Sequence, residues 1–96
     1  MSMQVRPSQC FAVGCSANKP EWALMCPRHW RMVPSRLQAE VYGAHAALKK
    51  DKGQLTPYLI ARGHAQAAVA REEGRSGDVI AAIEAEIATI EEQDRR

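Results

Sequence analysis

The fold of this chain is decided by residues 10–34, CFAVGCSANKPEWALMCPRHWRMVP, which hold every cysteine of the protein. Two close-spaced pairs of metal-ligating residue types stand here: Cys10 and Cys15, with four residues between them, and Cys26 and His29, with two. Zinc prefers four soft or borderline ligands in a tetrahedron, and structural sites commonly supply them as two such pairs. The spacing therefore predicts that these four residues hold one zinc ion.

The second pair carries its own helix signal. Pro27 suits the first position of a short helix, because the amide hydrogen that proline lacks would have no helical partner there. Cys26 would then be the N-cap, and residues three apart lie on one side of a helix, so the Cys26 sulfur and the His29 ring can reach one ion. The helix N-terminus also favours the thiolate that a metal needs. Because Val33 precedes Pro34, we expect the helix to end there.

Four protein ligands fill the coordination shell of zinc. A closed shell is typical of a structural site, because catalysis needs an open position for water. The sequence contains no HExxH motif, no zinc-deaminase pattern and no phosphate-binding glycine-rich loop. We therefore predict a protein that is not an enzyme. The alternatives are three unconnected buried cysteines with a surface histidine, another metal or a redox role, and a nucleophilic pair formed by Cys26 and His29.

Length and composition fit a small domain that needs such a cross-link. The chain has 96 residues, enough for one domain, and 46% of them are hydrophobic, many being alanine. A domain this small has a thin core and is marginally stable without a metal, a disulfide or a partner chain. An odd cysteine count and a polar start favour a cytoplasmic protein with reduced thiols. No apolar stretch approaches the roughly 20 residues that cross a membrane.

We expect an all-α fold, in which a knuckle- or treble-clef-like zinc module (residues 1–34) and three helices (residues 35–96) form one compact domain. Ser35 and Gln38 match a capping box, which would make Ser35 the N-cap of the first of the three helices. Gly53, which follows three lysines, is a suitable end for this helix. The apolar residues at helical spacing between these ends are Leu37, Val41, Ala44 and Leu48.

The next helix is marked by proline and glycine. Thr56 is the expected N-cap and Pro57 the first helical residue. The helix should run to about Glu73 and stop at Gly74. Gly63 lies inside it and costs about 1 kcal/mol relative to alanine. We therefore expect Gly63 to mark a close helix crossing.

The last helix should begin near Ser76 or Asp78. Its apolar positions fall three and four residues apart and form an isoleucine stripe: Ile80, Ile83, Ile87 and Ile90. Such a stripe is usually part of the core. A homodimer formed through this helix is the alternative, because the core is thin.

Charge is unevenly distributed along the chain. Residues 1–34 carry four positive and one negative side chain, a net +3, whereas residues 76–96 carry two positive and six negative, a net −4. The basic residues that could form a phosphate-binding face are Arg28, Arg31, Arg36, Lys49, Lys50 and Lys52. A solvated surface is the simpler interpretation, because the formal net charge of the whole chain is only +2. Lys19 is also close to the four expected ligands in sequence. Together with Arg28 and Arg31 it could offset the net negative charge of a zinc ion bound by three thiolates.

The run MCPRHWRMVP (residues 25–34), with the helix that follows it, resembles small Cys/His proteins of bacteriophages and prophages. These typically show a cysteine pair, then C-x-x-HW, then a proline, and the resemblance covers roughly residues 10–48. It implies a phage origin and zinc on Cys10, Cys15, Cys26 and His29. Small phage proteins of this size often bind and block a host protein, anti-CRISPR proteins being one example. The expected partner is therefore a bacterial host or defence protein, met in the host cytoplasm.

Partner binding would use the residues around the second ligand pair. Exposed tryptophan and arginine are favoured anchors of protein interfaces, and the candidates are Trp22, Trp30, Arg28, Arg31 and Arg36. We expect Trp30 to pack on the helix that follows, beside the zinc site, and a partner-binding anchor is the alternative. His45 and His64 are expected to be helix-surface or half-buried residues that hold no metal. A zinc-containing nucleic-acid-binding regulator is the alternative function, and it is not favoured because of the acidic C-terminal segment.

Overall fold

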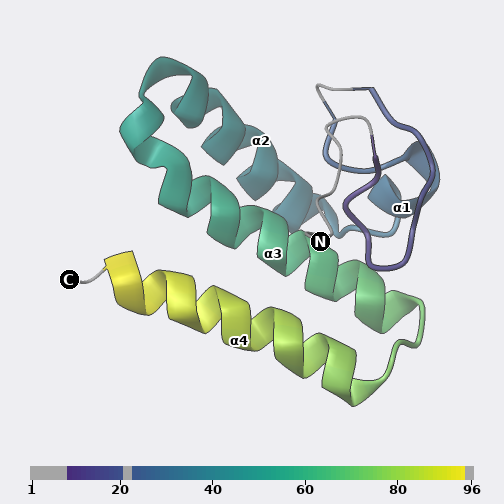
Figure 1. The fold of residues 1–96 in the computed structure, drawn as a ribbon. Helices are drawn as coiled ribbons and strands as arrows, with labels where there is room; N and C mark the ends of the chain where they lie inside the picture. Colours follow the sequence, from purple (N-terminus) through teal and green to yellow (C-terminus); the bar gives the residue numbers. More distant parts are fainter. Residues whose placement is uncertain (1–8, 21–22, 95–96) are drawn as a thin grey trace.

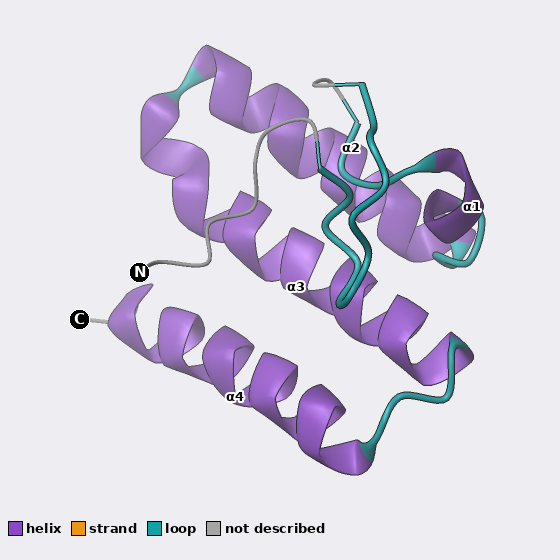
Figure 2. Cartoon of the chain, turned by 45° about the vertical axis from the view of Figure 1, so that its right-hand side comes forward, coloured by secondary structure: helices purple, strands orange, loops and turns teal. Residues whose placement is uncertain are grey.

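The structure is a computed structural model, which describes residues 9–20 and 23–94. The helices in these residues are α1 (Pro27–Trp30), α2 (Ser35–Lys50), α3 (Leu55–Glu72) and α4 (Gly77–Asp94), with the 3-10 turn η1 (Lys52–Gln54) between α2 and α3 (Figure 1). The described part of the chain has no strand, only one isolated antiparallel bridge between Gln9 and Asn18 (Figure 2). The prediction of an all-α fold with a Cys/His module before three helices is therefore confirmed.

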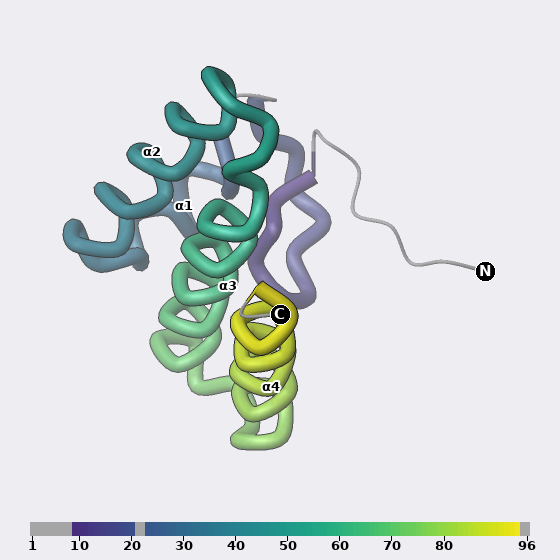
Figure 3. Tube along the Cα trace, turned by 90° about the vertical axis from the view of Figure 1, so that its left-hand side faces the viewer, coloured from purple at the N-terminus to yellow at the C-terminus, as the bar shows by residue number. Residues whose placement is uncertain are grey.

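Helix α3 is the centre of the fold. It lies between α2 and α4, and the loops that precede α1 lie beside it, as the ribbon and the view turned by 90° both show (Figures 1 and 3). The side chain of Gln66 on α3 donates to the carbonyl of Phe11 at 2.9 Å. The Arg62 guanidinium stacks over the Phe11 ring, 4.7 Å from its centroid. The N-terminal module is thus attached directly to the central helix.

Small side chains allow α3 to be covered on several sides. Its buried residues are Ala61, Gly63, Ala65, Ala67, Val69 and Ala70. A helix with apolar residues on several faces is stable only when neighbours cover those faces. At Gly63 the approach is closest, because a Cβ atom there would lie 2.7 Å from Cγ1 of Ile87 on α4. The predicted close crossing at Gly63 is confirmed.

The core consists of two clusters that share α3. One joins the cysteine module to α2 and α3 through residues such as Met25, Val33 and Val69. The other joins α3 to α4 through Ala67, Ala70, Ile83 and Ile87. Ile83 and Ile87 are buried within the single chain, whereas Ile80 and Ile90 are half-buried. The middle of the isoleucine stripe therefore belongs to the core. None of the described helices is long and apolar enough to cross a membrane.

The start of α2 differs from the sequence prediction. Ser35 is the first helical residue rather than the N-cap, Pro34 is the N-cap, and no side chain caps this end. Gln38 does not reach back to Ser35, because its amide donates to the carbonyl of Trp30 at 2.8 Å. The predicted capping box is therefore wrong. Its glutamine instead satisfies a carbonyl at the end of α1, which four residues separate from α2.

The junction of α2 and α3 also differs. Helix α2 ends at Lys50, and Gly53 does not stop it in the left-handed conformation. The Asp51 side chain instead accepts the Gly53 amide at 2.9 Å and starts η1, which leads directly into α3 at Leu55. Thr56 and Pro57 are accordingly in the first turn of α3, not its cap and first residue.

The end of α3 agrees with the prediction. The helix runs to Glu72 with Glu73 as its C-cap, and Gly74 follows with φ +70°. This left-handed conformation carries no penalty for glycine and closes the helix. Helix α4 then begins at Gly77, between the two starts that the sequence allowed.

Candidate metal centre

The first ligand pair lies on a tight loop. The Cys10 amide donates to the carbonyl of Ala17 at 3.0 Å, and the Cys15 amide donates to that of Ala12 at 3.1 Å. The loop turns at Gly14, whose φ of +76° is a conformation that glycine adopts readily. The Ala17 amide lies 3.5 Å from the Cys15 sulfur. These backbone bonds bring the two cysteines together although four residues separate them.

The second pair is presented by α1. Cys26 is the N-cap of this helix and Pro27 its first residue, as the sequence predicts. The Trp30 amide donates to the carbonyl of Cys26 at 2.9 Å and closes the turn. The helix ends at Trp30, somewhat before the expected stop at Val33. One helical turn is enough to bring the Cys26 sulfur and the His29 ring to the same side.

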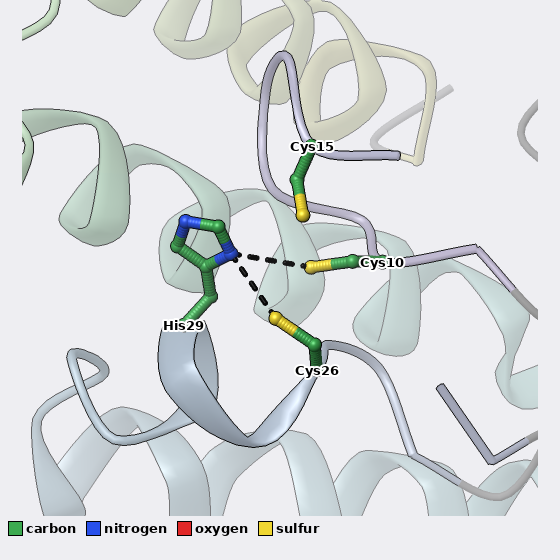
Figure 4. A group of neighbouring side chains, drawn as sticks. All are labelled: Cys10, Cys15, Cys26 and His29. Atoms are coloured by element: carbon green, nitrogen blue, oxygen red, sulfur yellow. Dashed lines mark hydrogen bonds between the residues drawn. The ribbon is translucent and has the colours of Figure 1, made fainter. Parts of the chain in front are cut away.

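The two pairs converge on one point between the loop and α1 (Figure 4). Each residue offers one ligand atom, and these four atoms lie within 4.8 Å of one another. The Nδ1 atom of His29 lies 3.6 Å from the Cys10 sulfur and 3.3 Å from the Cys26 sulfur. Cys10, Cys26 and His29 are buried, and Cys15 is half-buried. The group that the sequence predicts is therefore brought together.

These distances fit a bound metal ion. Ligand atoms about 2.0 to 2.3 Å from a tetrahedral zinc lie roughly 3.5 to 3.8 Å apart. The two contacts of Nδ1 with sulfur are already in or near that range, and no pair of ligand atoms is more than 4.8 Å apart, about 1 Å beyond it. Three sulfurs and one imidazole are soft or borderline donors. The residues are thus compatible with a metal site, and all three cysteines are free of disulfides.

The surroundings differ sharply between two of the thiols. Burial raises the pKa of the Cys10 thiol from 9.0 to about 11. Burial also raises the pKa of Cys26, but hydrogen bonds from the His29 backbone and ring and from Cys10 outweigh it and bring that pKa down to about 7. Cys26 therefore becomes a thiolate near neutral pH, whereas Cys10 remains a thiol there.

Glu73 is a member of the site that sequence reasoning missed. Its Oε2 lies 2.9 Å from Nε2 of His29, across 44 residues of sequence. A hydrogen bond from His29 lowers the pKa of the Glu73 carboxyl, so the group is a carboxylate that can only accept. Nε2 therefore carries a hydrogen, and Nδ1 is the ring nitrogen that faces the sulfurs. No spacing in the sequence marks Glu73, because it stands at the end of a helix far from the cysteines.

Of the three cations expected near the cysteine cluster, only Arg28 contacts His29 and Glu73. Arg28 lies at the site: its Nη2 is 3.7 Å from Oε2 of Glu73 and 3.1 Å from Nε2 of His29. Because Nε2 already donates to the carboxylate, we assign Arg28 to the ion pair with Glu73. The Lys19 amine instead contacts the carbonyl of Pro20. Arg31 is an exposed residue at the end of α1.

The candidate interface residues that the structure describes lie on α1, at its end and in the first turn of α2. Trp30, the last residue of α1, is half-buried, and its indole donates to the hydroxyl of Tyr42 on α2 at 2.9 Å, with the two rings edge to face. Arg36 pairs with Glu40 one turn along α2. Trp22 lies outside the described residues. His45 packs beside the Tyr58 ring, and His64 is exposed, so neither belongs to the cysteine cluster.

An apolar groove of about 350 Å³ lies beside the cysteine cluster. Residues from the N-terminal module, α1, α2 and α3 line it: Pro20, Ala23, Leu24, Met25, Pro27, Trp30, Val41, Tyr42, His45 and Tyr58. Of this set, the sequence indicated only Trp30 as a candidate partner-binding residue. The others could not be selected because their common surface exists only once α2 and α3 are in place.

The sequence and the structure were compared with protein-family models, curated proteins and solved structures, and none of them matches this chain. What the chain does must therefore be argued from its own residues.

Proposed function

We propose that Cys10, Cys15, Cys26 and His29 bind one zinc ion and that this site is structural. The observation that carries the proposal is the convergence of four zinc-type ligand atoms within 4.8 Å of one another, three of them on buried residues. Four protein ligands leave no position for a substrate or a reactive water. When bound, zinc would cross-link the loop of the first pair to α1.

The N-terminal module has little else to hold it. Its regular structure within the described residues is the four-residue helix α1 and one isolated bridge. Structural zinc in small modules contributes about 10–16 kcal/mol of apparent binding free energy at neutral pH, which becomes folding free energy. A domain of this size has a total stability of about 5–15 kcal/mol. The metal would therefore decide whether the module is folded.

We further propose that the protein is a non-enzymatic protein-binding module that uses the apolar groove beside Trp30. The groove is lined by four aromatic or imidazole rings, and Tyr42 on its wall is 56% exposed. Tryptophan and tyrosine dominate the binding energy of protein interfaces, because they bury large areas and retain a polar group for hydrogen bonding. The groove therefore suits an apolar side chain of a partner protein.

The nucleic-acid alternative has less support. Two of the six cations of the candidate phosphate-binding face are engaged with carboxylates: Arg28 with Glu73 and Arg36 with Glu40. A phosphate-binding face needs cations whose charge is not already offset. For the partner we retain the class that the phage resemblance implies, a bacterial host or defence protein bound and inhibited in the host cytoplasm, as an anti-CRISPR protein does. A homodimer through α4 is disfavoured, because Ile83 and Ile87 are already buried.

The binding proposal is tested by capture from a bacterial lysate treated with nuclease. Tyr42→Ala should lose a protein that the wild type retains, because it removes an exposed ring of the groove. Leu55→Ala is the matched control, since Leu55 is also a large exposed apolar residue, 48% exposed, but lies outside the groove. Equal capture by all three proteins would exclude the groove. A protein that is captured from untreated lysate but not from nuclease-treated lysate would favour the nucleic-acid alternative.

A further inference from the structure

The turn after α3 has a defined backbone geometry. The Gly74 amide donates to the carbonyl of Arg71 at 3.1 Å, and the Arg75 amide donates to that of Ala70 at 2.9 Å. With Gly74 at φ +70°, this pair of bonds is a Schellman motif. The motif fixes the backbone on both sides of the glycine, and therefore the directions in which Glu73 and Arg75 leave it.

These two side chains reach different halves of the metal centre. Glu73 accepts the Nε2 hydrogen of His29, a member of the second ligand pair. Arg75 donates through Nη2 to the carbonyl of Val13, at 3.0 Å, inside the loop of the first pair. Its guanidinium also covers Gly14 closely, because a Cβ atom on Gly14 would lie 3.0 Å from Nη2. One three-residue turn thus contacts both pairs.

We propose that the turn Glu73–Arg75 clamps the metal centre to the helices, with Glu73 acting as the positioning residue for His29 and Arg75 as the support of the cysteine loop. This inference rests on the zinc site proposed above. Its consequence is that metal affinity depends on the junction of α3 and α4, far from the ligands in sequence.

Glu73 acts through the ring of His29. With Nε2 donating to the carboxylate, Nδ1 points at the sulfurs, in the orientation in which its lone pair would bind a metal. Without the carboxylate, the ring is free to rotate or to change tautomer, and part of the binding free energy is spent on ordering it. Outer carboxylates of this type typically contribute about 10–100-fold to metal affinity.

The second carboxylate oxygen connects the two arms of the clamp. Oε1 of Glu73 is buried and has no hydrogen-bond partner among the described residues. The Arg75 guanidinium lies 3.7 Å from it and offsets its charge. A carboxylate without a nearby cation would be costly in such a place. Arg75 therefore supports the loop directly and also stabilises Glu73 as the acceptor of His29.

The affinity of each protein for zinc, measured by competition with a chromophoric chelator, tests the clamp. Glu73→Ala should bind zinc about 10–100-fold more weakly than wild type. Glu73→Gln should lose less, because its amide oxygen can still accept from Nε2. Glu72→Gln is the matched control: Glu72 is the neighbouring exposed carboxylate, and its removal should leave the affinity unchanged.

Arginine variants test the other arm. Arg75→Ala should release zinc to excess chelator several times faster than wild type. Arg71→Ala is its control, because Arg71 bridges to Glu84 on α4 at 2.6 Å without touching the cysteine loop. Circular dichroism verifies that each variant is folded. If Glu73→Ala is not folded, the zinc affinity of the isosteric Glu73→Gln is compared with that of the wild type instead, and an affinity equal to the wild type would contradict the role of Glu73.

A cobalt spectrum separates positioning from general stability. Cobalt bound by three sulfurs and one nitrogen gives visible bands that follow the ligand geometry. We expect these bands to change in cobalt-saturated Glu73→Ala but not in Glu72→Gln, whereas a carboxylate that only stabilises the fold would leave them unchanged. A wild type that binds no zinc would refute the metal site and the clamp together. A zinc-binding wild type, with unchanged affinity in Glu73→Ala and an unchanged release rate in Arg75→Ala, would overturn the clamp alone.

Discussion

A Cβ atom on Gly63 would lie 2.7 Å from Cγ1 of Ile87 and 3.1 Å from its Cδ1. Helices α3 and α4 therefore pack at a distance that a glycine permits and that alanine would not. Gly63→Ala adds helix propensity worth about 1 kcal/mol. It also overpacks a buried contact, which costs about 1–3 kcal/mol. We expect a net loss of about 1 kcal/mol in the free energy of unfolding, measured with urea, since the second effect is the larger.

Gly43→Ala is the matched control for this helix crossing. Gly43 lies inside α2, and a Cβ atom there would meet nothing within 4 Å. Only the propensity term then remains, so this variant should gain about 0.5–1 kcal/mol. Gly63→Ala becoming more stable by the same amount would show that Ile87 yields and that the crossing is not tight.

The isoleucine stripe supplies a second prediction. Ile83 is 7% exposed and packs in the cluster between α3 and α4. Ile83→Asp would place a carboxylate without a cation in this cluster, at a cost of several kcal/mol. We expect a large loss of helicity and of melting temperature by circular dichroism. Ala85→Asp, on the exposed side of the same helix, should leave both almost unchanged.

His29→Ala should act mainly on the N-terminal module. The variant leaves three cysteine ligands and an open coordination position, and it also removes the partner of Glu73. The module should lose its order at a lower temperature than the helices, because α2, α3 and α4 have apolar contacts of their own. Hydrogen exchange measured by mass spectrometry separates the two regions. Uniform protection in residues 10–33 and in α3 would contradict this order of melting.

Nucleic-acid binding is expected to be weak. The net charge is +2, and six of the carboxylates lie in residues 76–96. A small net charge gives little electrostatic attraction to phosphates at physiological salt. An electrophoretic shift assay should show no tight, sequence-specific complex with DNA. Nanomolar binding that falls steeply with salt would reverse the order of the two proposed functions.

Sequence alone predicted the parts of this structure that depend on short spacings. The clustering of four metal-ligating residue types follows from Cys10-x4-Cys15 and Cys26-x2-His29, and the start of α1 follows from Pro27. Gly74 ends α3 as expected, because its left-handed conformation is a local property.

The parts that failed depend on distant partners. Gln38 matches a capping box locally, but the carbonyl of Trp30 takes its amide once α1 has formed. Gly53 was expected to end α2, but its amide donates to the Asp51 side chain, which caps the following turn η1. Glu73 could not be found, because its role exists only when the end of α3 meets His29 across 44 residues.

The central claim is that the cysteine cluster holds structural zinc, and metal content tests it most directly. The protein is purified under reducing conditions without chelator, and its mass is measured under native and denaturing conditions alongside elemental analysis. One zinc per chain is predicted in the wild type, lost on denaturation and strongly reduced in a Cys10→Ser/Cys26→Ser double variant. A folded wild type that contains no zinc, and takes up none when it is supplied, would contradict the account.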